Sequence, residues 1–136
     1  KWSVKDASKD SFKLVKKILI DVPCSGTGVL ARKPDIRWRR KKGDILRFSE
    51  LQFSILKNMS KYLRKGGEIV YSTCSLEKEE NWSVVERFLN FYSNFFIVPA
   101  KLDHPKGWIN NKGCLETLPH VHGVDGMFAV KLKRKK

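Results

Sequence analysis

The chain has 136 residues, 41% of them hydrophobic, so it is long and apolar enough to fold as one domain with a core. Its 28 Lys and Arg residues against 14 Asp and Glu residues give a net charge of +14, which favours a polyanionic partner such as nucleic acid. No apolar run approaches the roughly 20 residues of a membrane-spanning helix, so no membrane partner is expected. Three widely spaced cysteines without a C-x-x-C pair indicate reduced thiols and a cytoplasmic location.

Hydrophobic periodicity and turn residues predict alternating strands and helices. In chain order we expect a strand (1–5), a polar connector (7–12), a strand (17–22), an exposed basic loop (30–47), a helix (45–64), a strand (67–73), a helix (77–92), a strand (94–98), a loop (99–122) and a last strand (126–132). The nearly unbroken apolar run in Lys17–Val22 predicts burial on both faces of a parallel sheet. Asp44 or Ser49 can cap the helix over 45–64, and Gly66-Gly67 is expected to end it. This order is α/β, and the long loop before the last strand allows an antiparallel strand at the end of the sheet.

Two of the predicted strands end in the same way, with a thiol in a polar turn. Asp21, Pro23 and Cys24 follow the first of them, and Cys74 follows the strand Gly67–Thr73. Open parallel sheets bind ligands beyond the carboxyl ends of their strands, so both thiols are expected at one crevice. Buried structural cysteines more often lie inside the apolar run. One such turn is equally well explained as a glycine-rich loop; the pair favours a site.

Two other patterns carry less weight. The motif Gly26-x-Gly28-x-x-Ala31 follows a strand, as a dinucleotide fingerprint does, but Pro34 cuts short the helix that should point at a pyrophosphate. Cys114, His120 and His122 lack an evident fourth ligand, so no metal is expected.

The basic loop is a candidate nucleic-acid surface. Residues 32–47 hold eight cations against two acids, and they include an aromatic side chain, Trp38. Planar groups among cations can stack on unpaired bases while the cations contact phosphates. The alternative is that this loop is only a solvated charged surface without a binding role. The residues expected to contact RNA are Arg32, Lys33, Arg37, Trp38, Arg39 and Arg40.

Taken together, these segments resemble the RNA cytosine-5 methyltransferases, in particular the Sun-type (Fmu-type) ribosomal RNA branch. The resemblance covers nearly the whole chain, and its paired Pro-Cys-Ser and Thr-Cys-Ser motifs are specific. Met127 stands where the family often has Phe, a conservative packing change. The matching segments are Asp21–Gly28, Arg32–Trp38, Leu51-Gln52, Gly66-Gly67, Tyr71–Ser75, Glu79–Asn81 and Asp125–Phe128.

The resemblance implies that residues 1–136 are the C-terminal portion of a Rossmann-like methyltransferase sheet, mostly parallel with an antiparallel last strand. It implies that Cys74 is the nucleophile and that Cys24 assists breakdown of the covalent adduct. The cofactor would be S-adenosylmethionine, contacted by Asp21, Pro23 and Asp6. The glycine-rich cofactor loop of the family lies upstream, so the chain, which begins with Lys, is expected to be a piece of a longer protein.

The expected function is therefore methylation of cytosine C5 in RNA, with ribosomal RNA as the substrate. A thiolate that adds to C6 makes C5 nucleophilic toward a sulfonium methyl group. Two alternatives stay open: a non-enzymatic basic RNA-binding module, which needs neither cysteine, and DNA cytosine methylation, in which the Pro-Cys thiol attacks. Without the missing N-terminal half, we expect this piece to be inactive, to bind cofactor weakly and to self-associate through an unpaired strand edge.

Overall fold

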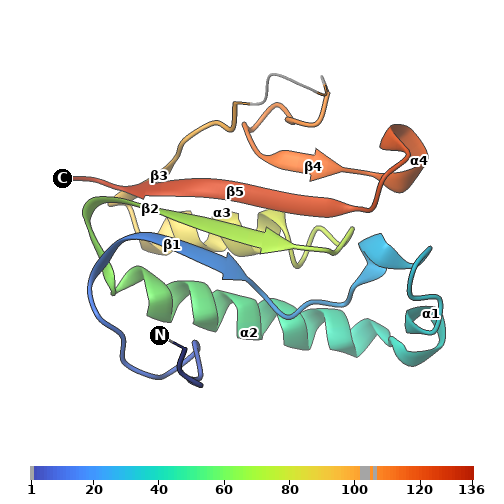
Figure 1. Ribbon diagram of the computed structural model, residues 1–136, viewed down its shortest axis with the longest axis horizontal. Coiled ribbons are helices and arrows are strands. Elements are labelled where there is room, and N and C mark those ends of the chain that lie inside the picture. Colours follow the sequence, from blue (N-terminus) through green and yellow to red (C-terminus); the bar gives the residue numbers. More distant parts are fainter. Residues whose placement is uncertain (1, 102–104, 106) are drawn as a thin grey trace.

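The computed structural model describes residues 2–101, 105 and 107–136. These residues form a single five-stranded sheet in the order β1-β2-β5-β3, with β4 also paired to β5 (Figure 1). The elements are β1 (Val15–Asp21), the 3-10 helix η1 (Thr27–Val29), α1 (Ile36–Arg39), α2 (Lys42–Ser60), β2 (Leu63–Thr73), α3 (Trp82–Phe91), β3 (Phe95–Ile97), β4 (Leu115–Thr117), α4 (Pro119–His122) and β5 (Met127–Arg134).

Strand directions follow the expected α/β plan. β1 and β2 are parallel, while β5 is antiparallel to β2, β3 and β4. Four strands therefore share one direction and the last strand alone is reversed. The prediction of a mostly parallel sheet with an antiparallel last strand is confirmed.

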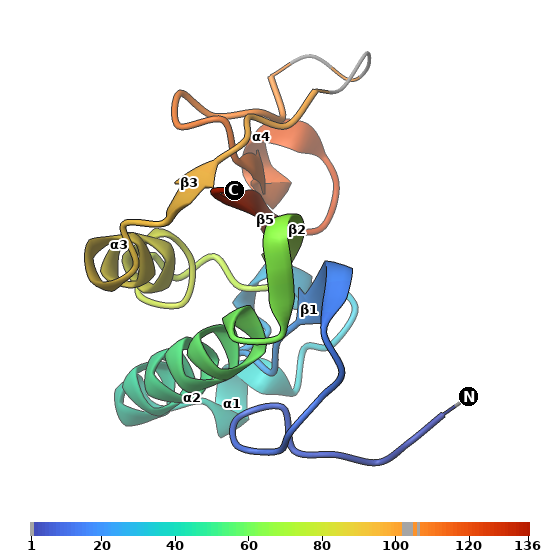
Figure 2. The ribbon, with the colours of Figure 1, turned by 90° about the vertical axis from the view of Figure 1, so that its left-hand side faces the viewer.

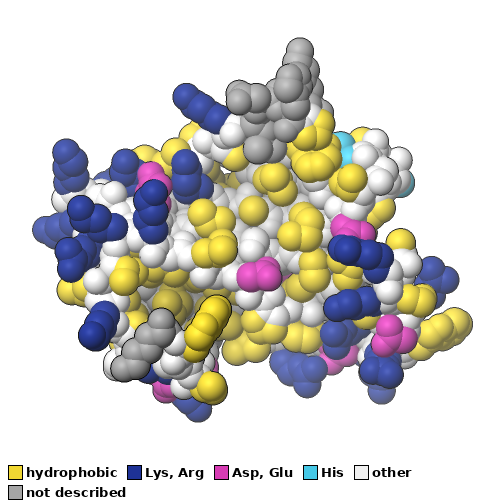
Figure 3. Space-filling view, in the orientation of Figure 1, with side chains coloured by type: hydrophobic (Ala, Val, Ile, Leu, Met, Phe, Trp, Pro, Cys, Tyr) yellow, Lys and Arg dark blue, Asp and Glu magenta, His cyan; other side chains and the backbone are white. Residues whose placement is uncertain are grey.

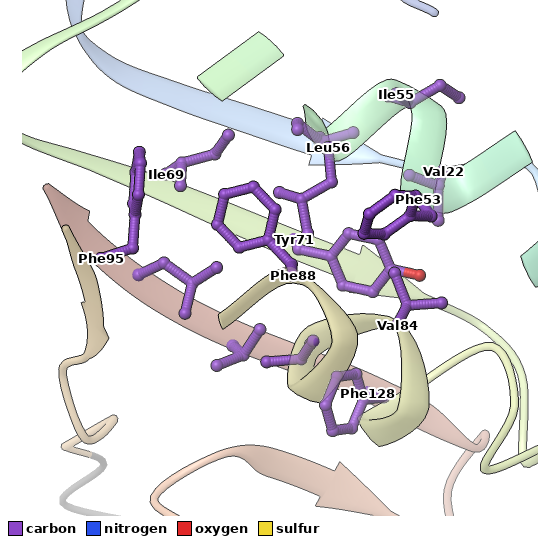
Figure 4. Close-up of a cluster of buried hydrophobic side chains, with 14 of the residues drawn as sticks. Val22, Phe53, Ile55, Leu56, Ile69, Tyr71, Val84, Phe88, Phe95 and Phe128 are labelled. Atoms are coloured by element: carbon purple, nitrogen blue, oxygen red, sulfur yellow. The ribbon is translucent and has the colours of Figure 1, made fainter. Parts of the chain in front are cut away.

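Both long helices, α2 and α3, cover the same face of the sheet (Figure 2). The core lies between that face and the helices, where Leu56, Tyr71 and Phe88 are fully buried (Figure 4). In the described part of the chain no helix covers the opposite face, and there Leu19 of β1 is 73% exposed, whereas its neighbour Ile20 is buried. The prediction that β1 is buried on both faces is therefore wrong for this chain.

The start of α2 differs from the expected one. The helix begins at Lys42 because the Asp44 carboxylate accepts a hydrogen bond from the backbone N–H of Lys41 (3.0 Å). Asp44 was one of the two expected caps; the other, Ser49, lies inside the helix and donates to the carbonyl of Glu79 (2.7 Å). Asp44 thus fixes the helix start by satisfying a backbone donor that the helix leaves free.

Gly66-Gly67 does not end the helix, which stops at Ser60, but lies inside β2. Gly66 adopts a φ of +73°, a conformation that glycine adopts readily, and a Cβ on Gly67 would meet the carbonyl of Lys16 at 2.7 Å. The β1–β2 register shifts at this point. The glycine pair therefore permits an irregularity in the strand pairing.

The predicted loops hold more regular structure than expected. Residues 30–47 include α1 and the start of α2, and residues 99–122 include β4 and α4. Residues 2–5 form no strand, and Lys1 lies outside the described residues. The helix predicted from residue 77 begins at Trp82 instead, after a turn at residues 78–81. None of the described helices is long and apolar enough to span a membrane.

Candidate active site

The carboxyl ends of β1 and β2 bring Cys24 and Cys74 together. Their Sγ atoms are 3.3 Å apart, and both thiols are free and half-buried. The pairing of the two strands continues past their ends, because the N–H of Val22 donates to the carbonyl of Ser72 (3.1 Å). The two strand-end thiols therefore share one crevice, as the sequence predicts.

Cys24 stands in surroundings that disfavour its thiolate. Burial, with the hydrogen bond to Cys74 as the next cause, raises the pKa of the Cys24 thiol from 9.0 to about 12. Cys24 therefore carries its proton at neutral pH, and its S–H can donate to the Sγ of Cys74. The geometry suits a pair in which one thiol bonds to a substrate and the other holds a proton beside it.

Glu80 contacts the loops that carry both thiols and is fully buried. Its Oε1 accepts hydrogen bonds from the backbone N–H of Ser25 (2.8 Å) and from Nε2 of Gln52 (2.9 Å). Its Oε2 accepts hydrogen bonds from the hydroxyls of Ser75 (2.5 Å) and Ser25. Ser25 and Ser75 are the residues that directly follow the two cysteines, so a single carboxylate connects both loops.

The turn that carries Glu80 is itself held by the end of β2. The Tyr71 hydroxyl donates to the carbonyl of Glu80 (2.6 Å), and burial, with the Glu80 charge next, raises the pKa of Tyr71 well above its usual range. Thr73 donates to Oδ1 of Asn81 (2.6 Å), and Nδ2 of Asn81 donates to the carbonyl of Ser75 (2.8 Å). The strand, the cysteine loop and the turn are thus fixed to one another by buried hydrogen bonds.

The glycine-rich loop after Cys24 serves close backbone contact. The N–H of Gly28 donates to the carbonyl of Cys74 (3.0 Å), and the carbonyl of Gly28 accepts from the N–H of Gly126 (2.8 Å). A Cβ on Gly28 would collide with both neighbouring backbones. Arg32 and Asp125 form an ion pair across the same contact. Between η1 and α4 lies an open, largely apolar cleft of about 490 Å³.

Two of the three predicted cofactor residues lie beside the cysteines. Asp21 ends β1 and is exposed, with its Oδ1 accepting a hydrogen bond from the Ser72 hydroxyl (3.1 Å). Because side chains alternate along a strand, Asp21 lies on the same uncovered face as Leu19. Pro23, which directly precedes Cys24, is also exposed. An exposed carboxylate at this position has free acceptor capacity for the amino or hydroxyl groups of a ligand.

Asp6, the third, lies elsewhere. Its Oδ1 accepts hydrogen bonds from the hydroxyl (2.6 Å) and the N–H (2.9 Å) of Ser8, which lower the pKa of Asp6. Asn58, near the end of α2, holds the following turn by donating to the carbonyl of Ala7 (3.0 Å). α2 runs opposite to β1 (Figure 1), so this turn lies at the other end of the strands from Cys24. The described structure does not bring Asp6 to the cysteines.

The predicted RNA-contact residues separate into two groups. Arg40 is anchored in the site, because its Nε donates to the carbonyl of Ser25 (2.8 Å) and its guanidinium lies 5.0 Å from the Phe48 ring centroid. Arg32 is engaged by its ion pair. The others are exposed at the end of the molecule where Figure 3 shows Lys and Arg side chains around α1, and one of them, Arg39, also forms an ion pair with Asp35 (3.5 Å). These exposed residues are Lys33, Arg37, Trp38 and Arg39.

The residues considered for a metal site have other surroundings. Nδ1 of His122 accepts a hydrogen bond from the N–H of Leu118 (2.9 Å) at the start of α4. Cys114 is fully buried in the core, and this burial raises the pKa of its thiol to about 11. Among the described residues no group of three or more His, Cys, Asp or Glu side chains is arranged to hold a metal ion.

Sequence reasoning gave Glu80 and Gln52 no role beside the thiols, although both stand in the matching family segments, and it expected Arg40 only as an RNA contact. It interpreted Glu80 as one of several acids at a helix start, yet α3 begins at Trp82 and has no acid in its first turn. The available signal was the acid and amide placed shortly after the Thr-Cys-Ser turn. Nothing local distinguishes Glu80 from Glu79, which is exposed.

Comparison with known proteins indicates a methyltransferase, in agreement with the fold and the thiol pair. A family model described as 16S rRNA methyltransferase RsmB/F matches residues 2–133. The chain is 41% identical over 128 residues to "Probable ribosomal RNA small subunit methyltransferase B" of Synechocystis sp., covering 93% of this chain and 29% of that protein. It is 37% identical over 122 residues to the protein of the same name from Bacillus subtilis, covering 88% and 27%.

Comparison with solved structures also indicates a methyltransferase. NSun6 from Pyrococcus horikoshii, crystallised with SFG, matches with a TM-score of 0.85 and 30% identity over 100% of this chain and 35% of that one. A methyltransferase homologue from the same organism matches with a TM-score of 0.71 and 30% identity, covering 90% and 40%.

These likenesses define the class of protein as a Rossmann-like methyltransferase. The chain belongs to the RsmB/F family of 16S rRNA methyltransferases, which confirms the resemblance found in the sequence. It spans less than a third of the length of the curated relatives described above.

Proposed function

We propose that the whole protein methylates C5 of cytosine in ribosomal RNA and that this chain supplies both thiols of the reaction. The observation that carries the proposal is the 3.3 Å separation of the Cys24 and Cys74 Sγ atoms at the ends of two parallel strands. RNA binding without catalysis needs no paired thiols. The net charge of +14 suits an RNA partner.

S-adenosylmethionine supplies the methyl group in this proposal, and the exposed Asp21 and Pro23 fit a role in holding it. The carboxylate of Asp21 can accept hydrogen bonds from such a ligand, and both residues lie at the strand end beside the thiols. The enclosing half of that site would come from the rest of the protein, because affinity for a whole nucleoside needs a concave pocket.

The two cysteines divide the chemistry. The Cys74 Sγ forms a bond to C6 of an unstacked cytosine, which raises the electron density at C5. After methylation of C5, its proton passes to water, the electrons of the C5–H bond re-form the C5–C6 double bond, and the C6–S bond breaks to release the Cys74 thiolate. Cys24, protonated at neutral pH because burial raises its pKa, lies in contact with Cys74 and assists this release.

Cysteine variants of the whole protein test these roles. With RNA containing 5-fluorocytidine, whose fluorine blocks the elimination, Cys74→Ala is expected to abolish the covalent adduct and to lower methyl transfer at least about a thousandfold. With ordinary RNA, Cys24→Ala is expected to form the adduct but to release it slowly, so that the adduct accumulates. Both species are measured on denaturing gels with labelled RNA.

Cys114→Ala is the matched control, because this third thiol lies in the core away from the pair; its adduct and turnover should equal those of the parent. An adduct that persists in Cys74→Ala and disappears in Cys24→Ala would reverse the roles, as in DNA cytosine methylation. No adduct in any of these proteins would favour a non-enzymatic RNA-binding module.

A further inference from the structure

We infer that Glu80 is a positioning residue that clamps the two cysteine loops together and thereby sets the separation of the Cys24 and Cys74 thiols. This role deepens the proposed function and rests on it for its catalytic consequence. The clamp itself, however, is a property of the thiol geometry and can be measured without any methyl transfer.

The first argument is where the carboxylate attaches. Its Oε2 accepts both serine hydroxyls, and these lie 3.1 Å from each other. Ser25 directly follows Cys24 in the chain and Ser75 directly follows Cys74, so each hydrogen bond to the carboxylate lies one residue from a reacting sulfur. A third contact, from the backbone N–H of Ser25 to Oε1, fixes the loop itself and not only a side chain.

The second argument is how firmly the carboxylate is held. Glu80 has no exposed surface, and all four groups that contact its carboxylate are donors. Gln52 reaches it from α2 and also donates to the carbonyl of Pro23 (2.9 Å), the residue before Cys24. Tyr71 fixes the Glu80 backbone from β2. The clamp is therefore braced by a helix and a strand, which limits the movement of both loops.

The third argument is that, beyond the thiol contact itself and the two serine hydroxyls that the carboxylate holds, the other described hydrogen bonds between the two loops lie farther from the sulfur of Cys24. The cysteine loops also meet where the N–H of Gly28 donates to the carbonyl of Cys74 and where the N–H of Leu76 donates to Oγ1 of Thr27 (2.9 Å). Thr27 and Gly28 both come after Ser25, so these contacts lie farther along the loop from Cys24 than the carboxylate contacts do. Thr27 and Ser75 hydroxyls are 3.4 Å apart, a long contact. Loss of the carboxylate should therefore loosen the thiol pair more than the fold.

The test compares Glu80→Gln, Glu80→Asp and the matched control Glu79→Gln in the whole protein. Glu79 is the exposed neighbour whose side chain has no hydrogen-bond partner among the described residues. Glu80→Gln keeps the shape but places a donor among donors, and Glu80→Asp keeps the charge but is one methylene too short to reach both serines. The direct readout is bridging of Cys24 and Cys74 by dibromobimane, located by peptide mass spectrometry; single alkylation by monobromobimane reports access to each thiol.

We expect Glu79→Gln to bridge at the parent rate and both Glu80 variants to bridge about a hundredfold more slowly, since misplacement by about 1 Å can have that effect. Single alkylation and RNA affinity should stay within about twofold, while formation of the 5-fluorocytidine adduct should fall as bridging does. Parent-rate bridging in folded Glu80 variants would overturn the inference. If the melting temperature, the RNA affinity and the bridging rate all fell together, the inference would also be overturned, because Glu80 would then act on stability alone.

Ser25→Ala and Ser75→Ala combined remove only the two hydroxyls of the clamp and serve if the Glu80 variants do not fold. This double variant should show the same slow bridging, and parent-rate bridging would contradict the clamp. The outcomes for the proposed function stay separate: slow bridging in the Glu80 variants, with no RNA adduct even in the parent protein, would support the clamp and refute the methylation chemistry.

Discussion

The thiol of Cys24 owes its properties to burial more than to its partner. Burial is the largest cause of the rise in its pKa to about 12, and the hydrogen bond with Cys74 is the second. A raised pKa means less thiolate at every pH below that value, and thiolate is the form that reacts with alkylating reagents. Cys24 is therefore suited to hold a proton rather than to attack.

This property predicts the pH dependence of Cys24 alkylation in the folded protein. Between pH 7 and 10 the rate with iodoacetamide should rise about tenfold per pH unit without levelling, because the whole range lies below the pKa. In urea, where the protein is unfolded, the rate should level near the ordinary value of 9.0. Peptide mass spectrometry follows the modified residue.

Cys74→Ala separates the two causes of the shift. The rise should still extend past pH 9 in this variant, since burial remains when the partner thiol is gone. Levelling near pH 9 in the folded parent protein would contradict the assignment of Cys24 as the protonated member of the pair.

At the scale of the elements, periodicity predicted most of the fold. The buried stripe of α2 and the strand β2 follow from apolar spacing, which burial against one face imposes on the sequence. The reversed direction of the last strand was implied by the family resemblance. The two thiols were predictable because each follows a strand end. Apart from the direction of the last strand, each of these features is indicated by a local pattern of about a dozen residues or fewer.

The missed features depend on partners far away in the sequence. Glu80 contacts Ser25 across 55 residues and Gln52 across 28, and no local pattern records these contacts. Gly66-Gly67 has the composition of a helix end, and its actual role in the irregular β1–β2 pairing depends on contacts with β1. The hydrogen bond from Arg40 to the Ser25 carbonyl likewise joins residues that no local pattern connects, and it does not test the prediction that Arg40 contacts RNA.

The element α1 and the turn before it predict a salt-dependent interaction with RNA. Replacement of the exposed residues Lys33, Arg37 and Arg39 by Ala should flatten the log–log dependence of RNA affinity on salt by up to about 2, at about 0.7 per lost phosphate contact. Arg40 is left in place because it holds the Cys24 loop. Fluorescence anisotropy with single-stranded RNA at several salt concentrations measures the slope.

A charge-matched control uses the opposite end of the molecule. Lys61, which follows α2, and Arg64 and Lys65, near the start of β2, are exposed cations, and their replacement by Ala removes the same charge. The control should leave the slope nearly unchanged. Equal flattening of the salt dependence by both triple variants would show that α1 is only a solvated charged surface and that RNA binding depends on the overall charge.

At the scale of the whole molecule, the sheet carries helices on one face only within the described residues. On the other face Leu19 stands opposite Val70 in the β1–β2 register, and Figure 3 shows hydrophobic side chains gathered across its middle. β1 is also the first strand of the sheet order, so one of its edges has no strand beside it in the described structure. Since the relatives are more than three times as long, we propose that another part of the whole protein covers this face and edge.

The 136-residue chain studied on its own should therefore self-associate. An apolar face beside an open strand edge favours pairing with a second copy. Leu19→Lys places a charge on that face and should weaken the association at least about tenfold, because burial of a leucine side chain contributes roughly 1.5–3 kcal/mol. Val121→Lys is the control, since Val121 is 62% exposed on α4, which is not part of the sheet. Sedimentation velocity across a range of concentrations measures the association; a chain that stays monomeric throughout, or two lysine variants that behave alike, would show that this face needs no cover.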